Sequence, residues 1–162
     1  MPDKSKDVAG VLVFPPLIPL LALVIGILLD WLLPLQFLAP IPLALRVVVG
    51  LVLFVLGITS AVAGTRAFKR VGTNVNPLQP SLALTGEGIF AHLRNPMYVG
   101  MALAVLGIVV GFALEWTLFA LVVGALVMHV GVVLREERYL ERKFGNDYRT
   151  YKARVPRYGW KF

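Results

Sequence analysis

Two adjacent carboxylates, Glu136 and Glu137, stand directly after the last apolar block of the chain. A carboxylate close to hydrocarbon costs free energy unless a cation accompanies it. A helical salt bridge would need a basic residue three or four positions away, and neither glutamate has one. We therefore expect their partners to be water, a nonlocal Arg or Lys, or a cationic ligand.

A second group of residues, Arg94–Gly100, reads R-N-P-M-Y-V-G and opens an apolar block. Asn is favoured at the N-cap of a helix and Pro at its first position, so Asn95 and Pro96 predict a helix start. The free backbone N–H groups of such a start, here those of Met97 and Tyr98, suit a carboxylate or a phosphate. With Arg94 adjacent, this segment is a candidate anion site.

Other motifs carry little chemistry. The histidines, His92 and His129, lack the spacing of metal ligands and the chain has no cysteine, so we predict no metal site. The segment 86–91 formally matches the dinucleotide pattern G-x-G-x-x-A, but no strand precedes it and a single match is weak. No G-x-S-x-G motif is present.

The elements that must position these residues are four apolar blocks, at about 11–33, 43–64, 96–114 and 116–134. Each is close to the ~20 residues that span hydrocarbon. The sequence, which is 58% hydrophobic, therefore predicts an all-α integral membrane protein with four transmembrane helices in a single domain, 1–162. Three prolines, Pro15, Pro16 and Pro19, indicate that the first regular helix begins near Leu17.

Apart from Arg46, near the start of the second block, the positive charge is confined to segments outside these blocks, which argues against a nucleic-acid partner. Two basic residues, Lys4 and Lys6, precede the first block, four lie between the second and third, and nine follow the fourth. Basic residues collect on the cytoplasmic side, so both termini and the connection 65–95 are expected there. We expect a retained first span and the inner (plasma) membrane of a prokaryote.

The two predicted cytoplasmic segments differ in character. The connection 65–95 is rich in Gly, Asn and Pro, and a loop of this length is often functional. In the tail, 135–162, we expect a cytoplasmic amphipathic helix over 135–144, a break at Gly145-Asn146-Asp147 and a short second piece over 148–154.

At this point the residues resemble a known group of membrane enzymes, the isoprenylcysteine carboxyl methyltransferase and phospholipid N-methyltransferase superfamily. The resemblance covers about the C-terminal 90 residues, and the first two blocks match only as apolar segments. It rests on an R-[HN]-P-x-Y-x-G block and an E-E-x-x-L block in that order, separated by one apolar hairpin. The residues that carry it are the segment 73–100, Glu136, Glu137, Leu140, Phe144, Gly145, Tyr148, Tyr151, Val155, Pro156 and Arg157.

The resemblance implies a cytoplasmic pocket for S-adenosylmethionine, roofed by the central connection and the C-terminal helix. The expected cofactor-binding residues are Leu84, Thr85, Phe90, Asn95, Pro96, Met97, Tyr98, Glu136 and Glu137, joined by Arg94 beside the helix start. The ammonium and sulfonium of the cofactor would supply the cations that the glutamates lack, and its carboxylate suits the helix start. Many family members have His where this chain has Asn95, so only a backbone or amide contact is carried over to that position.

The sequence limits the identity of the methyl acceptor less than that of the cofactor. Prenylcysteine enzymes of this superfamily have an arginine four residues before the first glutamate, and this chain has Val132 there. That difference argues against a prenylcysteine carboxylate and leaves a phospholipid amine or another small amphiphile, reached through a lateral opening between helices. An amine acceptor must be unprotonated to react. Arg135, Arg154 and Arg157 are candidates for contact with substrate or with lipid phosphates.

Two other functions remain open on the sequence. An NADPH-dependent sterol-type membrane reductase has a similar C-terminal half, but such enzymes are usually longer and need extra basic residues. A nonenzymatic bundle that scaffolds or transports would pair its glutamates with Arg94 or Arg66. The first alternative predicts binding of NADPH, and the second predicts no cofactor.

Overall fold

The computed structural model describes residues 7–159, and this part of the chain contains helices and no strand. Lys4 and Lys6, which entered the orientation argument, lie outside it. The long elements are α1 (Leu17–Leu32), α2 (Leu43–Arg70), α3 (Pro96–Phe112), α4 (Glu115–Met128) and α5 (Leu134–Arg154). A 3₁₀ turn, η2 (Gly88–Ala91), precedes α3, and a π-helical turn, η3 (His129–Val133), joins α4 to α5.

Two of the helices are long and apolar enough to cross a membrane. They are α2, with 28 residues, and the continuous rod Glu115–Arg154, with 40 residues. The helices α1 and α3 are also apolar but shorter, with 16 and 17 residues. Large aliphatic side chains along α1, α2 and α4 face outward, among them Leu28, Leu51 and Leu126. A surface of this kind suits lipid, and the molecule is a membrane protein.

Local sequence explains most helix boundaries. α1 begins at Leu17, as the three prolines predict, and Pro96 is the first residue of α3. α2 continues to Arg70, beyond the end predicted at Gly64, so the connection to η2 is shorter than expected. The added turn ends with Lys69 and Arg70, whose positive charges are favourable near a helix C-terminus.

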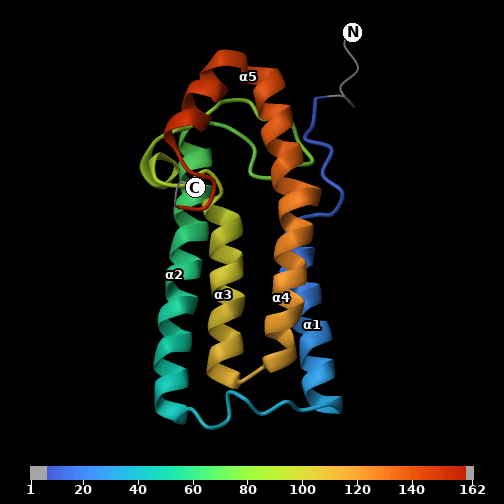
Figure 1. Cartoon of the computed structure of the whole chain (residues 1–162). Coiled ribbons are helices and arrows are strands. Elements are labelled where there is room, and N and C mark those ends of the chain that lie inside the picture. The colour runs from blue at the N-terminus through green and yellow to red at the C-terminus, as the bar shows by residue number, and fades with distance from the viewer. Residues whose placement is uncertain (1–6, 160–162) are drawn as a thin grey trace.

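The helices are arranged as two pairs, α2 with α3 and α1 with α4 (Figure 1). Glycines let the backbones of α2 and α3 approach closely. A Cβ atom at Gly57 would lie 2.6 Å from the carbonyl oxygen of Gly100, and one at Gly100 would lie 2.5 Å from that of Gly57. Small residues serve this purpose in membrane helices, because close backbone contact replaces the hydrophobic driving force.

This contact gives a first testable prediction. Gly57→Leu forces α2 and α3 apart, and overpacking of this kind costs roughly 1–3 kcal/mol. We therefore expect the variant to unfold several degrees below the wild type in a thermal melt followed by circular dichroism in detergent. Val55→Leu, at an outward-facing position of the same helix, should melt with the wild type. Equal melting of both variants would contradict the packing described here.

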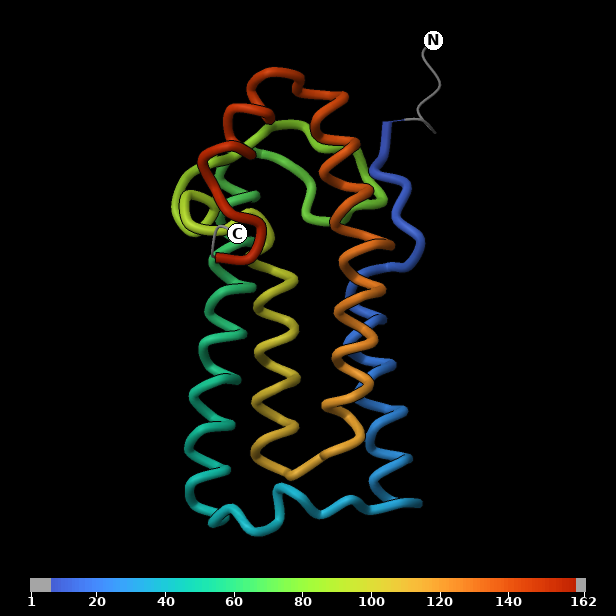
Figure 2. Tube along the Cα trace, in the orientation of Figure 1, coloured from blue at the N-terminus to red at the C-terminus, as the bar shows by residue number. Residues whose placement is uncertain are grey.

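The described ends of the chain, α5 and the α2–α3 connection lie at one end of the bundle, and the two short connections lie at the other (Figure 2). At that other end, Asp30 accepts a hydrogen bond from the backbone N–H of Trp116 at 3.1 Å. The indole of Trp116 donates to the carbonyl oxygen of Leu33 at 2.7 Å. These bonds tie the tight α3–α4 hairpin to the end of α1.

Two irregularities shape the rod formed by α4, η3 and α5. In the π-helical turn η3, the carbonyl oxygen of Gly131 accepts a hydrogen bond from the backbone N–H of Leu12 at 3.0 Å, which holds the N-terminal segment against the rod. Gly145, with φ 55° and ψ −124°, bends α5. This bend lies where the sequence predicts a break, and it turns the C-terminal part of α5 back over the bundle.

Candidate functional site

A cavity lies where α5 folds over the α2–α3 connection, and we call it the polar cavity. All ten residues that the sequence predicts for cofactor binding line it: Leu84, Thr85, Phe90, Arg94, Asn95, Pro96, Met97, Tyr98, Glu136 and Glu137. Aromatic side chains that the prediction did not include, among them Phe68, Tyr139, Tyr148 and Tyr151, complete the wall. Segments far apart in sequence therefore meet at one site.

The roof of the polar cavity is an irregular segment, 73–85, fixed by side-chain hydrogen bonds. The hydroxyl of Thr73 accepts from the backbone N–H of Leu82 at 2.9 Å, and the amide of Asn74 donates to the carbonyl oxygen of Pro80 at 2.8 Å. The hydroxyl of Tyr139, on α5, accepts from the N–H of Ser81 at 3.0 Å. Because residues 73–85 form no helix or strand, these side-chain hydrogen bonds take the place of the regular backbone hydrogen bonds.

The turn η2 anchors the side of the cavity next to the roof. The rings of Phe68 on α2 and Phe90 on η2 stack at a centroid distance of 4.8 Å. The hydroxyl of Tyr151 on α5 donates a hydrogen bond to the carbonyl oxygen of Phe90 at 2.8 Å. Phe90 thereby links α2, η2 and α5 beside the N-terminus of α3.

The start of α3 differs in one respect from its prediction. Asn95 occupies the N-cap position, but its side chain makes no capping hydrogen bond. Its amide donates instead to the carbonyl oxygen of Arg157 at 3.2 Å, and the backbone N–H of Arg94 donates to the carbonyl oxygen of Pro156 at 3.0 Å. The helix start is thereby joined to the C-terminal segment, which the sequence pattern could not indicate.

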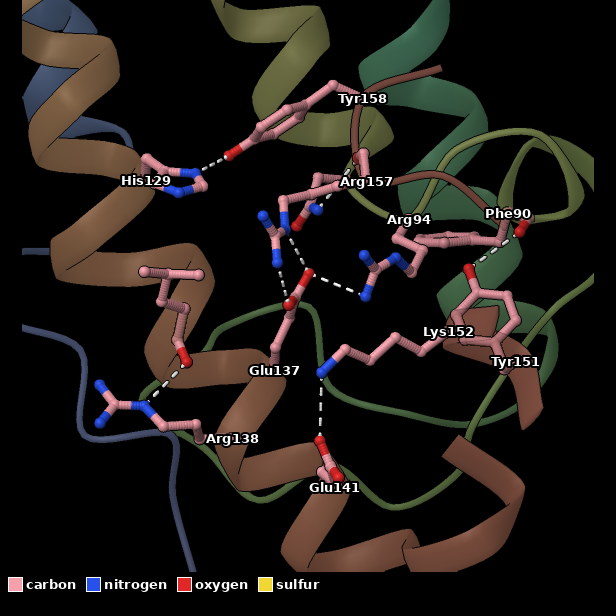
Figure 3. Close-up of polar contacts among 12 residues, drawn as sticks. Phe90, Arg94, His129, Glu137, Arg138, Glu141, Tyr151, Lys152, Arg157 and Tyr158 are labelled. Carbon is pink, nitrogen blue, oxygen red and sulfur yellow. Dashed lines mark hydrogen bonds and ion pairs between the residues drawn. The ribbon is translucent and has the colours of Figure 1, made fainter. Parts of the chain in front are cut away.

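Glu137 finds its counter-charges within the protein (Figure 3). Arg157 donates from Nε to Oε1 and from Nη2 to Oε2, both at 2.8 Å. Arg94 Nη1 lies 2.9 Å from Oε1. Of the partners that the sequence left open for Glu137, the structure shows the nonlocal arginine: two arginines distant in sequence neutralise this buried carboxylate.

Glu136 is in a different situation. The hydroxyl of Tyr98 donates to its Oε1 at 2.9 Å, and in the part of the chain that the structure describes no ion pair reaches its carboxylate. Burial raises the pKa of the Glu136 carboxyl to about 7. The hydrogen bond from Tyr98 lowers this pKa, and the negative charge of Glu137 raises it further. Glu136 therefore lines the cavity as a buried carboxyl group with no cation beside it among the described residues.

Arg94 offers the complementary feature on the same cavity. Its side chain is 8% exposed, and its Nε makes no hydrogen bond within residues 7–159. A buried N–H without a partner is costly, and a bound carboxylate would satisfy it. Arg94 Nε and the Glu136 carboxyl are thus two buried polar groups that line the same cavity, one without an acceptor and one without a cation.

The three arginines predicted as acceptor contacts do not line the polar cavity. Arg157 is held by Glu137, and Arg135 Nη1 donates to the carbonyl oxygen of Gly10 at 3.1 Å. Arg154 is exposed on α5. Val132, at the position where prenylcysteine enzymes carry an arginine, is fully buried.

A second cavity lies on the other side of Tyr98, between the helix pairs, and we call it the apolar cavity. It has a volume of about 340 Å³, and its lining is mostly aliphatic, with Tyr98, His129 and Tyr158 as the polar side chains. Nδ1 of His129 lies 2.7 Å from the hydroxyl of Tyr158 (Figure 3). Among the described residues, Tyr98 alone lines both cavities.

His129 and Tyr158 are candidate functional residues that the sequence analysis did not identify. The histidines were considered there only as metal ligands. A titratable side chain inside an apolar block was the available signal, because such residues are rare in membrane helices and often functional. The contact with Tyr158 depends on the path of the chain after α5 and has no local sequence signal.

Comparison with known proteins adds independent information. A family model described as phospholipid methyltransferase (PEMT) matches residues 45–147, which is more than half of the chain. An uncharacterized protein of Haemophilus influenzae is 38% identical over 64 residues, which are 38% of this chain and 98% of that protein. No solved structure matches the chain significantly. The range of the family model contains all ten predicted cofactor residues.

Proposed function

Because the chain belongs to the phospholipid methyltransferase family, we propose that it transfers a methyl group from S-adenosylmethionine to a lipid-like or small amphiphilic acceptor at the cytoplasmic face of the membrane. The observation that carries this proposal is that two buried polar groups of the polar cavity, the Glu136 carboxyl and Arg94 Nε, each lack a partner. Glu136 lacks a cation and Arg94 Nε lacks an acceptor, and an amino-acid group satisfies both.

The residues of the polar cavity would divide the work of binding. Arg94 holds the carboxylate, Glu136 holds the ammonium, and Tyr98 orients Glu136 through its hydroxyl. Glu137, which also binds Arg157, keeps Arg94 in place. S-adenosylmethionine supplies an activated methyl group on a sulfonium, so the protein contributes mainly positioning and the exclusion of water. The aromatic wall and the roof segment 73–85 perform that exclusion.

The roof must move when a ligand of this size enters. The polar cavity holds about 80 Å³ of free space, whereas ligand pockets usually measure roughly 300–1,000 Å³. The hydrogen bonds of Thr73, Asn74 and Tyr139 are the contacts that would open and re-form. Binding is then accompanied by outward movement of the segment 73–85, and closure follows once the ligand is seated.

We further propose that all four apolar helices cross the membrane, with the polar cavity, the connection 71–95 and α5 on the cytoplasmic side. The grouping of basic residues at that end supports this orientation. The membrane would be the inner membrane of a prokaryote. α1 and α3, with 16 and 17 residues, extend about 24–26 Å along their axes, so a slightly thinned bilayer accommodates them.

The nonenzymatic alternative has one observation in its favour. It pairs a glutamate with Arg94, and Glu137 does contact Arg94. It gives no reason for Glu136 to lie on the same cavity without a cation. The sterol-type reductase needs further basic residues for the phosphate of NADPH, and Arg94 is the one Lys or Arg that lines the described polar cavity.

Isothermal titration of the detergent-purified protein with S-adenosylhomocysteine and with NADPH tests the proposal. S-adenosylhomocysteine retains the ammonium and the carboxylate of the methyl donor, so we expect it to bind at one site, and we expect no heat from NADPH. Binding of NADPH alone would support the reductase. Binding of neither would support a scaffold or transporter and would remove the proposed function.

A further inference from the structure

The N-terminal segment 7–12 lies along one face of the rod formed by α4, η3 and α5 (Figure 2). Its partners on the rod recur at every fourth position and therefore share a helix face: Gly131, Arg135, Tyr139 and Lys143. The backbone N–H of Leu12 donates to the carbonyl oxygen of the first at 3.0 Å, and the carbonyl oxygen of Gly10 accepts from the second at 3.1 Å. Asp7 contacts the other two. The segment is thus bound to the rod at both of its ends.

The hydroxyl of Tyr139, a buried residue, joins this segment to the roof of the polar cavity. The hydrogen bond from Lys143 lowers the pKa of the Asp7 carboxyl, so Asp7 is ionised at neutral pH and can only accept hydrogen bonds. The Tyr139 hydroxyl therefore donates its proton to Asp7, whose Oδ1 lies at 3.0 Å, and turns its lone pairs to other donors. These donors are the N–H of Ser81 in the roof, at 3.0 Å, and Nζ of Lys143, at 3.1 Å.

The same segment contributes to the wall of the polar cavity. Ala9 is buried and lines the cavity, as do Ser81, Tyr139 and Glu136. Outward movement of the roof at Ser81 breaks the hydrogen bond to Tyr139, because hydrogen bonds of this kind extend to only about 3.2 Å. The position of the segment 7–12 and the opening of the cavity are therefore linked through Tyr139.

Resting on the proposed function, we propose that the segment 7–12 is a latch on the cofactor site, in which Asp7 is a positioning residue that acts through Tyr139 to hold the roof closed. The range matched by the family model begins at residue 45 and does not include this latch. Entry and exit of the cofactor both require the hydrogen bond between Tyr139 and Ser81 to break, so the latch limits the rates of both steps. Because the bond forms again over the bound ligand, the latch leaves the affinity almost unchanged.

The first experiment measures the association and dissociation rates of radiolabelled S-adenosylhomocysteine by rapid filtration of the purified protein in nanodiscs. Tyr139→Phe keeps the ring and removes the hydrogen bond to Ser81. Loss of one such bond corresponds to roughly a two- to tenfold change, so we expect both rates to rise by that factor and Kd to stay within twofold of the wild type. A merely structural role of Tyr139 would reduce the amount of competent protein without accelerating association. Unchanged rates, or a loss of affinity without faster association, would overturn the latch.

Asp7→Ala tests whether Asp7 acts through Tyr139. The main-chain carbonyl oxygen of Asp7 lies 3.1 Å from the hydroxyl and can still accept its proton in the variant, so we expect a smaller rise of both rates, about two- to threefold. Combining Asp7→Ala with Tyr139→Phe should give the rates of Tyr139→Phe alone, because both changes break one chain of contacts. Glu141→Ala, which removes another carboxylate paired with a lysine of α5, should keep the wild-type rates. Additive effects of the two changes would overturn the role of Asp7.

Hydrogen–deuterium exchange of the protein without ligand tests the latch independently of the proposed function. The N–H groups of the roof segment 73–85 should exchange roughly two- to tenfold faster in Tyr139→Phe than in the wild type or in Glu141→Ala. Equal exchange in all three proteins would overturn the latch, whatever the protein binds. Faster exchange in Tyr139→Phe from a protein whose wild type does not bind S-adenosylhomocysteine would support the latch on the polar cavity and remove the proposed function, so the two failures are distinguishable.

Discussion

Glu136→Ala is expected to weaken binding of S-adenosylhomocysteine at least thirtyfold. Glu136 supplies the negative charge that the ammonium of the ligand meets, and no other carboxylate of the described polar cavity is free for that role, because Glu137 is held by Arg94 and Arg157. Removing one partner of a desolvated charge pair commonly costs 2–5 kcal/mol, and about 2 kcal/mol corresponds to the thirtyfold loss. Isothermal titration of the purified variant measures this change.

Two variants control this measurement. Glu136→Gln keeps the hydrogen bond of Tyr98 but removes the charge, so it should lose most of the affinity as well. Glu141→Ala removes a carboxylate that pairs with Arg149 and Lys152 on a more exposed part of α5, and it should bind as wild type. Wild-type affinity in Glu136→Ala would show that the ligand cation lies elsewhere.

The pH dependence of the same titration follows from the pKa of Glu136. Burial raises that pKa to about 7 in the empty protein, so below pH 7 the carboxyl is mainly protonated. A cationic ligand favours the carboxylate, and binding must then release a proton. Affinity should therefore rise with pH from about 5 to 7 and level off above, and the slope should disappear in Glu136→Gln. Proton release is measured by titration in buffers of different ionisation enthalpy.

Glu137→Ala is expected to destabilise the fold by about 3 kcal/mol. The variant leaves Arg94, whose side chain is 8% exposed, without its counter-charge, and releases Arg157 from the first turn of α5. Removing one partner of a buried ion pair typically costs 3–5 kcal/mol, and the low end applies because the Arg157 side chain is 30% exposed. Unfolding by SDS in mixed micelles measures the difference.

Glu141→Ala is again the matched control, because its partners lie on the outer face of α5 and such pairs contribute little. It should unfold within about 1 kcal/mol of the wild type. If Glu137→Ala unfolded like the wild type and lost only ligand binding, Glu137 would be a ligand-binding residue and the structural role assigned to it would be wrong.

The elements and their ends were predictable where the signal is local. Prolines set the start of α1 at Leu17 and of α3 at Pro96, and Gly145 marks the bend of α5. The apolar blocks predicted the helices because hydrophobic length is a property of the segment itself. Of the ten residues predicted for the polar cavity, Leu84, Thr85 and Phe90 were found only through the resemblance to a family, whereas the helix start with Arg94 and the two glutamates were also indicated by their own chemistry; the structure brings all ten together.

The remaining features depend on which segments the fold brings together. Arg157 reaches Glu137 only because Gly145 turns the chain back, and the amide of Asn95 bonds to the Arg157 carbonyl for the same reason. No offset rule along one helix can find such partners. The extension of α2 to Arg70 was missed because its last turn is polar, and the prediction followed the apolar block alone.

The most direct test of the account is transfer of a labelled methyl group. The purified protein is incubated with methyl-labelled S-adenosylmethionine and a membrane lipid extract, and the organic phase is analysed by thin-layer chromatography. We predict a labelled lipid with the wild type and none with Glu136→Ala. Label that stays entirely in the aqueous phase, from a wild-type protein that is folded by circular dichroism and supplied with every lipid of the extract, would contradict the account.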